Sequence, residues 1–502
     1  MNHSKKGGIL LSYLNIILSM LVNVVLTPLL ITSLADDTYS LYKVMSSFSG
    51  PLIMFNMGVS TIVARSIVQY QTTDVNDKAK KENTLAMANI ISLAMAALVM
   101  LVGCIMCLTI PSIYGGNYSA DLIRVAQTIF VIMVLSVAVH IMTEAFKGCV
   151  IGHECFVFNY GTQTIRYLLK FGGIIFVLQA GWGVIAVALV DLLNNLVVFL
   201  AYFLYATLRL HERPKLHAFD RQEMREIALF SVAILLQTIV NQVNNNVDIM
   251  ILGALESQKE IITMYSSALT IYTVYNSMIT VFSTVYFPQT AKLVTRGCTA
   301  TELTDLVIKP GRMQAMIATA IIFGFAFLGK DFITLWIGEK YINAYYVTLM
   351  LLIPVTIPLV ENVCISIMDA QMKRMVRSVV LVVMAGINVI LTLIGVHWIG
   401  FWGAALGTVI SLLIGHVIIM NVYYQKWMGI QVFRMFRSIF KGTLPVGITT
   451  GVACFPLTLI KLSHPLWFVA KGAIFLLIYT VLLWFFSMTK EEKQHLLKNF
   501  KK

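Results

Sequence analysis

The longest polar interruption in this chain reads RLHERPKLHAFDRQEMR and spans residues 209–225. It contains five basic residues, which are Arg209, Arg213, Lys215, Arg221 and Arg225. Six long apolar segments precede this stretch and eight follow it. We therefore expect it to join two membrane-embedded halves of similar design, so that one half can move against the other.

The composition is typical of a polytopic membrane protein. Of the 502 residues, 58% are hydrophobic and 12% are charged, whereas soluble domains carry about 25% charged residues. The mean hydropathy is +0.81. The N-terminus, MNHSKKGGILLSYLNIIL, has the basic start of a signal peptide, but no small-residue cleavage motif follows its apolar run. We interpret this run as the first transmembrane helix.

The apolar segments predict the fold class. A helix of about 20 residues crosses the hydrocarbon core of a bilayer. Fourteen segments are long enough, at residues 8–34, 41–68, 84–110, 121–148, 159–179, 183–208, 226–255, 262–290, 311–337, 343–369, 375–397, 403–426, 441–461 and 466–487. We therefore expect an all-α polytopic membrane protein with 14 transmembrane helices and both termini on the same side.

The basic residues are distributed unevenly across the predicted membrane. Thirty of the 37 Lys and Arg residues fall on the side of the termini, and the other seven are Lys43, Arg124, Lys259, Lys330, Lys340, Lys461 and Lys471. Because cytoplasmic loops are rich in Lys and Arg, we expect a multi-pass protein of the cell membrane with cytoplasmic termini. The charge also suits anionic membrane lipids, and nucleic acid is not needed to explain it.

The two halves resemble each other at an offset of 220 residues. Trp182-Gly183 matches Trp402-Gly403, and Leu192-Leu193 matches Leu412-Leu413. A repeat of six helices plus six is a known transporter plan, with the substrate site between the repeats. We therefore expect two pseudo-symmetric six-helix lobes at 1–208 and 226–426, a cytoplasmic linker at 209–225, and two further helices with a basic tail at 427–502.

The sequence shows no enzyme signature or cofactor site. Gly324 to Lys330 reads GFAFLGK, which has the spacing of a phosphate loop, but Asp331 replaces the Ser or Thr that would bind magnesium and no strand precedes it. Cys104 and Cys107 lie within an apolar helix without further metal ligands nearby. We therefore expect a transporter without a cofactor, driven by a proton or sodium gradient or by the gradient of its substrate.

The fifth and fourth segments carry charged residues in the membrane, where such residues usually face the protein interior or a wet cavity. In the fifth, one helical face holds Asn159, Thr162, Arg166 and Lys170. Lys170 lies near mid-membrane, whereas Arg166 can alternatively extend to the inner surface. In the fourth, a second polar face holds Ser136, His140, Glu144 and Lys147, of which the last two can pair with each other.

The seventh segment has an unusual polar run, QTIVNQVNNNVDIMILG, at residues 237–253. One face holds Gln237, Asn241, Asn244 or Asn245, and Asp248. The asparagines can instead hold helices together through hydrogen bonds. The first segment has a similar but less dense stripe, made of Ser12, Asn15, Ser19 and Asn23. The remaining candidates are Lys43, Arg65, Arg124, Asp191 and Glu361, the last of which follows two prolines in a candidate gate helix.

Several stretches resemble a known family. They are MGVSTIVARSIV at 57–68, ADDTYSLYKV at 35–44, MDAQMKRMVRS at 368–378 and INVILTLIGVHWIGFWGAALGTVISLL at 387–413. Together with the arrangement of six, six and two helices, they resemble the polysaccharide (O-antigen-type, Wzx-like) flippase branch of the MOP (multidrug/oligosaccharidyl-lipid/polysaccharide) exporter superfamily. The chain departs from the family pattern at Asp36-Asp37, where a glycine-containing turn is usual.

The resemblance implies that a bacterial protein of this kind moves an undecaprenyl-diphosphate-linked oligosaccharide across the cytoplasmic membrane by alternating access. Basic residues would bind the diphosphate and amides the sugar hydroxyls; the candidates are Lys170, Arg166, Lys43, Arg65, Arg124, Lys147, Asn23, Asn241 and Asn245. Candidates for coupling to an ion are Asp248, Glu361, Glu144 and Asp191. The lipid tail would stay in the bilayer, along segments 441–461 and 466–487.

Three alternatives remain open at this point. A lipid II flippase of peptidoglycan synthesis shares the 14 helices. A multidrug exporter of the same superfamily usually has 12 helices and an acidic cavity. A membrane glycan polymerase or ligase would need a large outer loop, and the predicted outer loops are short. A glycan polymerase and glycosyltransferases of the same pathway are candidate partners, whereas the glycan, the coupling ion and the oligomeric state are not specified by the sequence.

Overall fold

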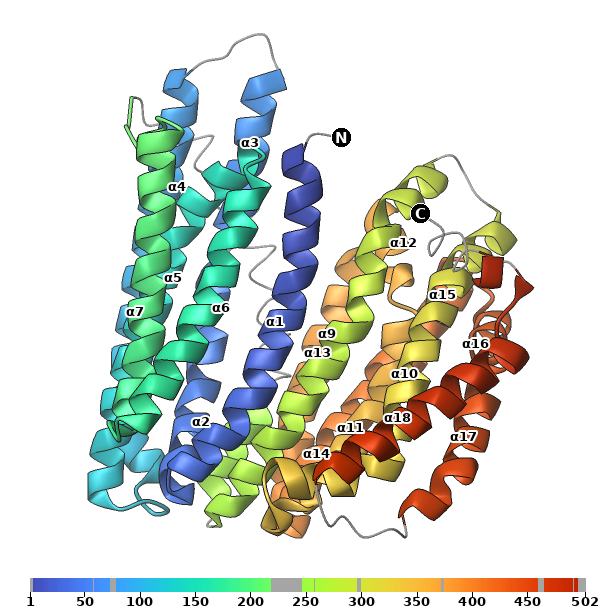
Figure 1. The fold of residues 1–502 in the computed structure, drawn as a ribbon. Coiled ribbons are helices and arrows are strands. Elements are labelled where there is room, and N and C mark those ends of the chain that lie inside the picture. The colour runs from blue at the N-terminus through green and yellow to red at the C-terminus, as the bar shows by residue number, and fades with distance from the viewer. Residues whose placement is uncertain are drawn as a thin grey trace. The chain divides into compact units, whose positions relative to one another are not determined.

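The computed structural model describes residues 3–56, 58–72, 78–217, 246–256, 258–295, 299–371, 374–458, 465–490 and 492–494. Within these residues the chain is helical, with no β-strand (Figure 1). It divides into two compact units, Met1–Thr263 and Met264–Lys502, called unit 1 and unit 2 below. The predicted all-α class is therefore confirmed.

Unit 1 is a bundle of long helices. They are α1 (His3–Ser33), α2 (Asp36–Leu52), the short 3₁₀ helix η1 (Ile53–Asn56), α3 (Val59–Thr72), α4 (Lys78–Tyr114), α5 (Ala120–Gly152), α6 (Phe156–Gln179), α7 (Gly183–Leu204) with the π-helical turn η2 (Tyr205–Arg209), and a short apolar helix at Asn246–Leu255. Helix α5 packs against α2, α3, α4 and α7, and α1 packs against α6. The core of this unit therefore surrounds α5.

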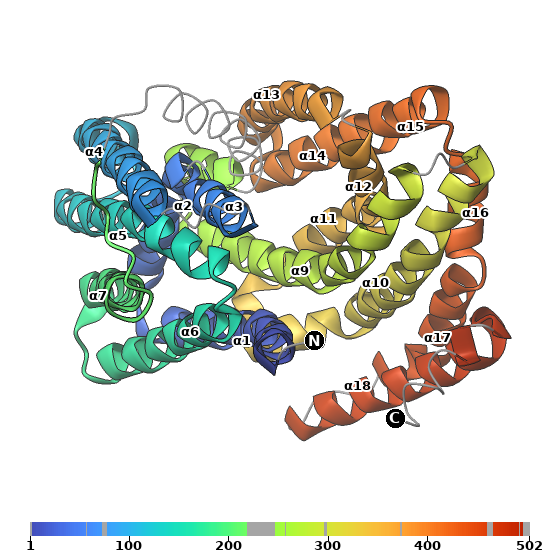
Figure 2. The same cartoon turned by 90° about the horizontal axis from the view of Figure 1, so that it is seen from above.

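Unit 2 contains most of α9 (Lys259–Thr295) and all later elements. These are α10 (Ala300–Trp336), η3 (Glu339–Tyr341), α11 (Asn343–Val360), α12 (Val363–Ala370), α13 (Arg374–Ile399), α14 (Phe401–Leu412), the π-helical η4 (Leu413–Met420), α15 (Asn421–Trp427), α16 (Val432–Phe440), α17 (Thr443–Thr458), α18 (Pro465–Leu482) and the π-helical η5 (Leu483–Ser487). Helix α10 is its centre, since α11, α16, α17 and α18 all pack along it (Figure 2).

Ten of the helices in the described residues are long and apolar enough to cross a membrane. Helix α6 is not among them, because Asn159, Gln163, Arg166 and Lys170 lower its mean hydropathy. The predicted segments 226–255, 262–290 and 441–461 lie partly outside the residues whose side chains are described. The chain is thus a multi-pass helical membrane protein, and the count of 14 stays a prediction.

Two segments that were predicted as continuous helices are interrupted in the structure. The segment 41–68 is interrupted by η1, where Pro51 lacks a backbone donor and Gly58 adopts φ +63°. The segment 343–369 is interrupted at Glu361-Asn362, after two prolines in α11. The predicted turn at Asp36-Asp37 is instead the first turn of α2, where acidic side chains are favourable next to the positive end of the helix dipole.

The C-terminal helices are fixed to α10 by polar contacts along its length. Near the middle, the hydroxyl oxygens of Thr319 and Tyr479 are 2.6 Å apart. Further along, Lys471 Nζ donates to Asp331 Oδ2 at 2.8 Å, and the lysine is 2% exposed. Since α17 also packs against α10, these helices belong to unit 2.

Candidate functional site

Lys43, Lys170 and Asp191 lie together in unit 1, on α2, α6 and α7. Lys170 Nζ is 2.9 Å from Asp191 Oδ1, and both side chains are about one third exposed or less. Lys43 is an electrostatic neighbour of Lys170, and its Nζ lies 5.5 Å from the centre of the Tyr39 ring. Lys170 is therefore paired with Asp191, and Lys43 places a second ammonium group beside Lys170.

The spacing of polar residues along α2 and α7 positions Lys43 and Asp191 in this group. Tyr39, Tyr42 and Lys43 lie within about one turn of α2. Tyr42 lies close enough to Asp191 to interact with its charge. Asp191 begins a polar face of α7 that continues with Asn194 and Asn195. These two amides bind α6 and α5, since Asn194 donates to the Arg166 carbonyl at 2.9 Å and Asn195 to Ser136 Oγ at 2.7 Å. They fix α7 so that Asp191 reaches Lys170.

Glu144 is the centre of a second group in unit 1, on the buried side of α5. Lys147 Nζ donates to Glu144 Oε1 at 2.8 Å, and the carboxylate is 3% exposed. His140 Nε2 lies 3.9 Å away, and the Ser60 hydroxyl hydrogen-bonds the same side chain. Arg166 is an electrostatic neighbour of His140, so α6 contributes to both groups. Glu144 is thus a fully partnered carboxylate.

Glu361 is the buried acid of unit 2, in the break between α11 and α12. It is 2% exposed and lies beside the Asn421 side chain, whose Nδ2 donates to the Val417 carbonyl at 3.1 Å. Arg377 of α13 is an electrostatic neighbour, but no ion pair at 4.0 Å or less joins Glu361 to a cation in the described residues. Its Oε2 atom has no hydrogen-bond partner there. This carboxylate is therefore less completely partnered than Glu144.

The two buried acids have matching surroundings. Tyr202 of α7 is an electrostatic neighbour of Glu144 and Arg166. Tyr424 of α15 is an electrostatic neighbour of Glu361 and Arg377. The two acids, the two arginines and the two tyrosines are each separated in the sequence by roughly 220 residues, which is the offset of the predicted repeat. Each unit thus contains a buried acid with an arginine and a tyrosine nearby.

Asp248, the acidic candidate of the seventh segment, is 2% exposed in the helix Asn246–Leu255. Tyr114 Oη donates to the Met250 carbonyl at 3.1 Å and Asn117 Nδ2 to the Ala254 carbonyl at 2.8 Å, which attaches this helix to α4 and the loop after it. Asn241 and Asn245 lie outside the described residues, so their placement stays a prediction.

The other candidates are more exposed. Arg124 is 3.8 Å from Asp121 at the start of α5, with side chains 80% and 93% exposed. Arg65 of α3 and Asn23 of α1 are also exposed, and neither belongs to the two groups in unit 1. In the stripe of α1, Asn15 has a structural role, because it donates to the Tyr160 carbonyl and accepts from Thr164, both at 2.8 Å.

Several residues that lie next to Lys43 and Glu361 were not predicted from the sequence. Tyr39 and Tyr42 were not candidates, although aromatic residues within about one helical turn of a membrane lysine are a usable signal. Arg377, Tyr424 and Asn421 surround Glu361 but were not singled out, because they lie on other helices. Among the described residues, no group of three or more His, Cys, Asp and Glu side chains could hold a metal ion.

Long apolar helices with charged residues grouped inside them define a polytopic membrane transporter. The fold is similar to the lipid II flippase MurJ in an inward closed conformation, with a TM-score of 0.72, 12% identity, and coverage of 95% of this chain and 97% of that chain. It is also similar to an inward-facing multidrug resistance MATE transporter, with a TM-score of 0.63, 13% identity, and coverage of 84% and 96%.

A further similar structure is a MOP superfamily transporter from Pyrococcus furiosus whose binding pocket has reverse polarity, with a TM-score of 0.56, 15% identity, and coverage of 87% and 97%. Comparison with curated protein sequences gives no match. Residues 4–294 match the model of the family described as polysaccharide biosynthesis protein. The chain belongs to this family, and the resemblance to MOP superfamily flippases is confirmed.

Proposed function

We propose that this protein is a flippase for an undecaprenyl-diphosphate-linked oligosaccharide, which it carries from the cytoplasmic to the outer leaflet by alternating access of its two lobes. The observation that carries the proposal is the group of Lys43, Lys170 and Asp191, in which one carboxylate pairs with Lys170 and a second lysine lies close to the first. An excess of positive charge inside a membrane protein is costly unless an anion compensates it. The diphosphate bridge of a lipid-linked oligosaccharide is such an anion.

The neighbouring charges support the same assignment. Along α5, α6 and their partners, four cations (Lys43, Lys147, Arg166 and Lys170) accompany two carboxylates (Glu144 and Asp191). This excess suits an anionic substrate and does not suit the cationic drugs expected of a multidrug exporter. Charge-assisted hydrogen bonds from lysine and arginine to phosphate are short and strong. Lys170 and Lys43 are therefore assigned to the diphosphate, with Arg166 one turn away on α6.

The role of Asp191 in this proposal is to hold Lys170 while the site is empty. A lysine within a membrane helix is stabilised by a paired carboxylate, and the 2.9 Å contact supplies that partner. The diphosphate competes with Asp191 for the same ammonium group. Binding therefore exchanges one ion pair for another, and this keeps affinity low enough for release at the outer leaflet.

Ion coupling is assigned to Glu361, with Asp248 as the second acid. Glu361 has a buried carboxylate oxygen without a partner in the described residues, and a proton or sodium ion could satisfy it. Glu144 and Asp191 already have lysine partners at 2.8 Å and 2.9 Å. They are weaker candidates for exchange with a solution ion.

The proposal is tested by Lys170→Ala in a bacterium whose surface polymer depends on this protein. We expect at least a ten-fold loss of exported glycan at equal amounts of membrane-inserted protein, and partial activity for Lys170→Arg. Lys340→Gln, an exposed lysine beyond the end of α10, serves as the matched control. Normal export by Lys170→Ala would contradict the assignment.

The alternatives give different phenotypes. If depletion stops growth and causes lysis instead of removing a surface polymer, the transported molecule is lipid II. If depletion changes only the sensitivity of cells to cationic drugs, the protein is a multidrug exporter. Either result would replace the proposed substrate while leaving the family assignment intact.

A further inference from the structure

Helix α16 (Val432–Phe440) is a short amphipathic helix that hydropathy did not predict, between the apolar segments α14–α15 and α17. Gly429 and Gly442 flank it with φ of +73° and +86°, a backbone conformation that residues with a Cβ rarely adopt. A Cβ on Gly442 would lie 2.9 Å from Ser487 Cα, so the end of η5 passes directly against this bend. The chain therefore turns twice to place α16 at one end of unit 2.

One face of α16 is buried and the other is open. Met435 and Ile439 are fully buried in a core cluster with residues of α10, α12 and α15. Phe433 is 78% exposed, and Arg437, one turn further along, is exposed as well. An apolar residue beside a cation on the open face is the pattern of a helix that lies in a membrane interface.

The surroundings of α16 continue this pattern. Trp427 is 61% exposed at the end of α15, and Phe485 and Phe486 of η5 are 70% and 75% exposed. Four exposed cations accompany them, which are Lys426, Arg437, Lys441 and Lys490. We call these seven residues, together with Phe433, the α16 surface. None of its four cations pairs with a carboxylate among the described residues, whereas Arg434 on the same helix pairs with Asp305 at 2.7 Å.

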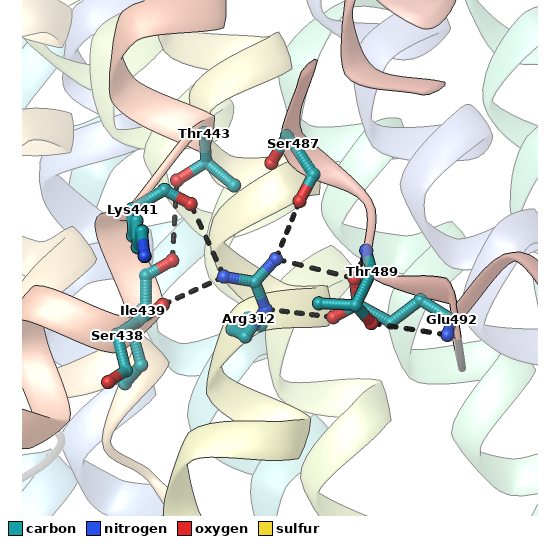
Figure 3. A network of polar contacts seen from close by, with 8 residues as sticks. All are labelled: Arg312, Ser438, Ile439, Lys441, Thr443, Ser487, Thr489 and Glu492. Carbon is teal, nitrogen blue, oxygen red and sulfur yellow. Dashed lines mark hydrogen bonds and ion pairs between the residues drawn. The ribbon is translucent and has the colours of Figure 1, made fainter. Parts of the chain in front are cut away.

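Arg312 of α10 connects the elements beneath this surface (Figure 3). It is 9% exposed and donates to the carbonyls of Ser438 and Ser487 at 2.8 Å and of Lys441 at 3.3 Å. Its Nε also donates to Glu492 Oε1 at 2.8 Å. The end of α16, the bend before α17 and the end of η5 are thus held by one guanidinium group and cannot move independently of α10.

We propose that the α16 surface is a docking site for anionic phospholipid headgroups, with the aromatic side chains placed among the upper parts of the acyl chains. The apolar segments 401–427 and 466–487 both end at this surface, so a leaflet boundary lies at its level. The positive-inside prediction makes that leaflet the cytoplasmic one. Lipid bound there is attached through Arg312 to the central helix of unit 2.

Charge and shape favour a leaflet over other occupants. The four cations, which have no carboxylate partner among the described residues, attract anionic lipids, and each Lys or Arg near such a surface contributes about a five-fold gain in affinity. Exposed Trp and Phe at the ends of membrane helices prefer the headgroup region. The inference does not depend on which substrate the protein transports.

The test uses the full-length protein, delipidated in detergent and titrated with phosphatidylglycerol or phosphatidylcholine, with bound lipid counted by native mass spectrometry. We expect the wild type to retain phosphatidylglycerol preferentially. The double variant Arg437→Gln/Lys441→Gln should lower that preference by about twenty-five-fold. Lys340→Gln, at the other end of α10, should leave it unchanged. Phe433→Ser should weaken binding of both lipids equally.

Three outcomes would overturn the proposal. The first is a wild type that binds both lipids equally. The second is a double variant that keeps the wild-type preference. The third is displacement of phosphatidylglycerol by soluble glycerol phosphate at a similar concentration, which would show that the cations bind a free anion and that no leaflet docks there.

Discussion

Glu144 in unit 1 and Glu361 in unit 2 are both buried acids but have different partners. Each is almost completely buried and has an arginine and a tyrosine nearby. Glu144 has a lysine ammonium at 2.8 Å and a serine hydroxyl. Glu361 has an asparagine amide on one side and an oxygen without a partner in the described residues on the other. The two buried acids thus differ in the partner that each one has.

The difference indicates two uses of a buried carboxylate. A carboxylate in a close ion pair is costly to disturb, because removing one partner leaves an uncompensated charge. A carboxylate without a close cation can exchange a proton or a metal ion without breaking an ion pair. We therefore regard Glu144 as a structural charge of unit 1 and Glu361 as the exchanging group of unit 2.

The largest expected effect is that of Lys147→Met, which leaves Glu144 buried without its cation. Breaking a buried pair costs about 3–5 kcal/mol. We expect a large loss of folded protein after heating in detergent, measured by fluorescence-detected size exclusion. The double variant Lys147→Met/Glu144→Gln should recover much of the loss. If Lys147→Met retains wild-type thermal resistance, Glu144 is not a structural charge.

The second effect separates the two acids directly. Glu361→Gln should keep or raise thermal resistance, because no cation pairs with this carboxylate within 4.0 Å in the described residues. Glu144→Gln should lower it, because Lys147 loses its partner. In proteoliposomes, Glu361→Gln should also make transport insensitive to proton and sodium gradients. Equal changes in both glutamine variants would refute the contrast.

A smaller effect is expected for the tyrosine of unit 1. Tyr202 Oη donates to Asn159 Oδ1 at 2.8 Å and is buried beside Glu144. Tyr202→Phe removes one buried hydrogen bond, which contributes about 1 kcal/mol. The apparent melting temperature should therefore fall by a few degrees with little change in transport. A loss of transport at unchanged stability would give Tyr202 a functional role instead.

The smallest effect concerns an acid outside the membrane-spanning segments. Burial raises the pKa of the Glu492 carboxyl, but hydrogen bonds from Arg312 and Thr489 and the charge of Arg312 outweigh burial, so the pKa lies below its usual range. The resulting stabilisation is present above the pKa of an unfolded glutamate, about 4.3, and is lost as the pH falls through the folded-state value. Glu492→Gln should therefore be less stable than wild type at pH 7 and approach it below pH 4. A difference independent of pH would contradict this account.

Much of the fold could be predicted because apolar runs and membrane thickness determine where helices can lie. The predicted segments 84–110, 121–148 and 183–208 correspond to α4, α5 and α7 with η2. The breaks at residues 53–58 and 361–362 were not placed by hydropathy, because the segments on both sides of each break are apolar, although Pro51, Pro354 and Pro358 mark both regions as places for bending. Helix α16 was missed because nine residues with two arginines give no transmembrane signal.

The candidate site was predictable only where partners share a helix. Glu144 and Lys147 are three residues apart, so their pairing follows from helical spacing. Lys170 and Asp191 lie on different helices, and the sequence contains each charge but not their contact. Glu361 was found from its place after two prolines, but its neighbours Arg377, Asn421 and Tyr424 depend on tertiary packing.

The central claim is that Lys43 and Lys170 bind an anion that competes with Asp191. It is tested most directly by measuring the binding of undecaprenyl diphosphate to the purified protein and to two variants of opposite charge change. We predict that Lys43→Gln weakens binding several-fold and that Asp191→Asn strengthens it, because the carboxylate no longer competes for Lys170. The account is contradicted if both variants shift the affinity in the same direction, or if neither changes it.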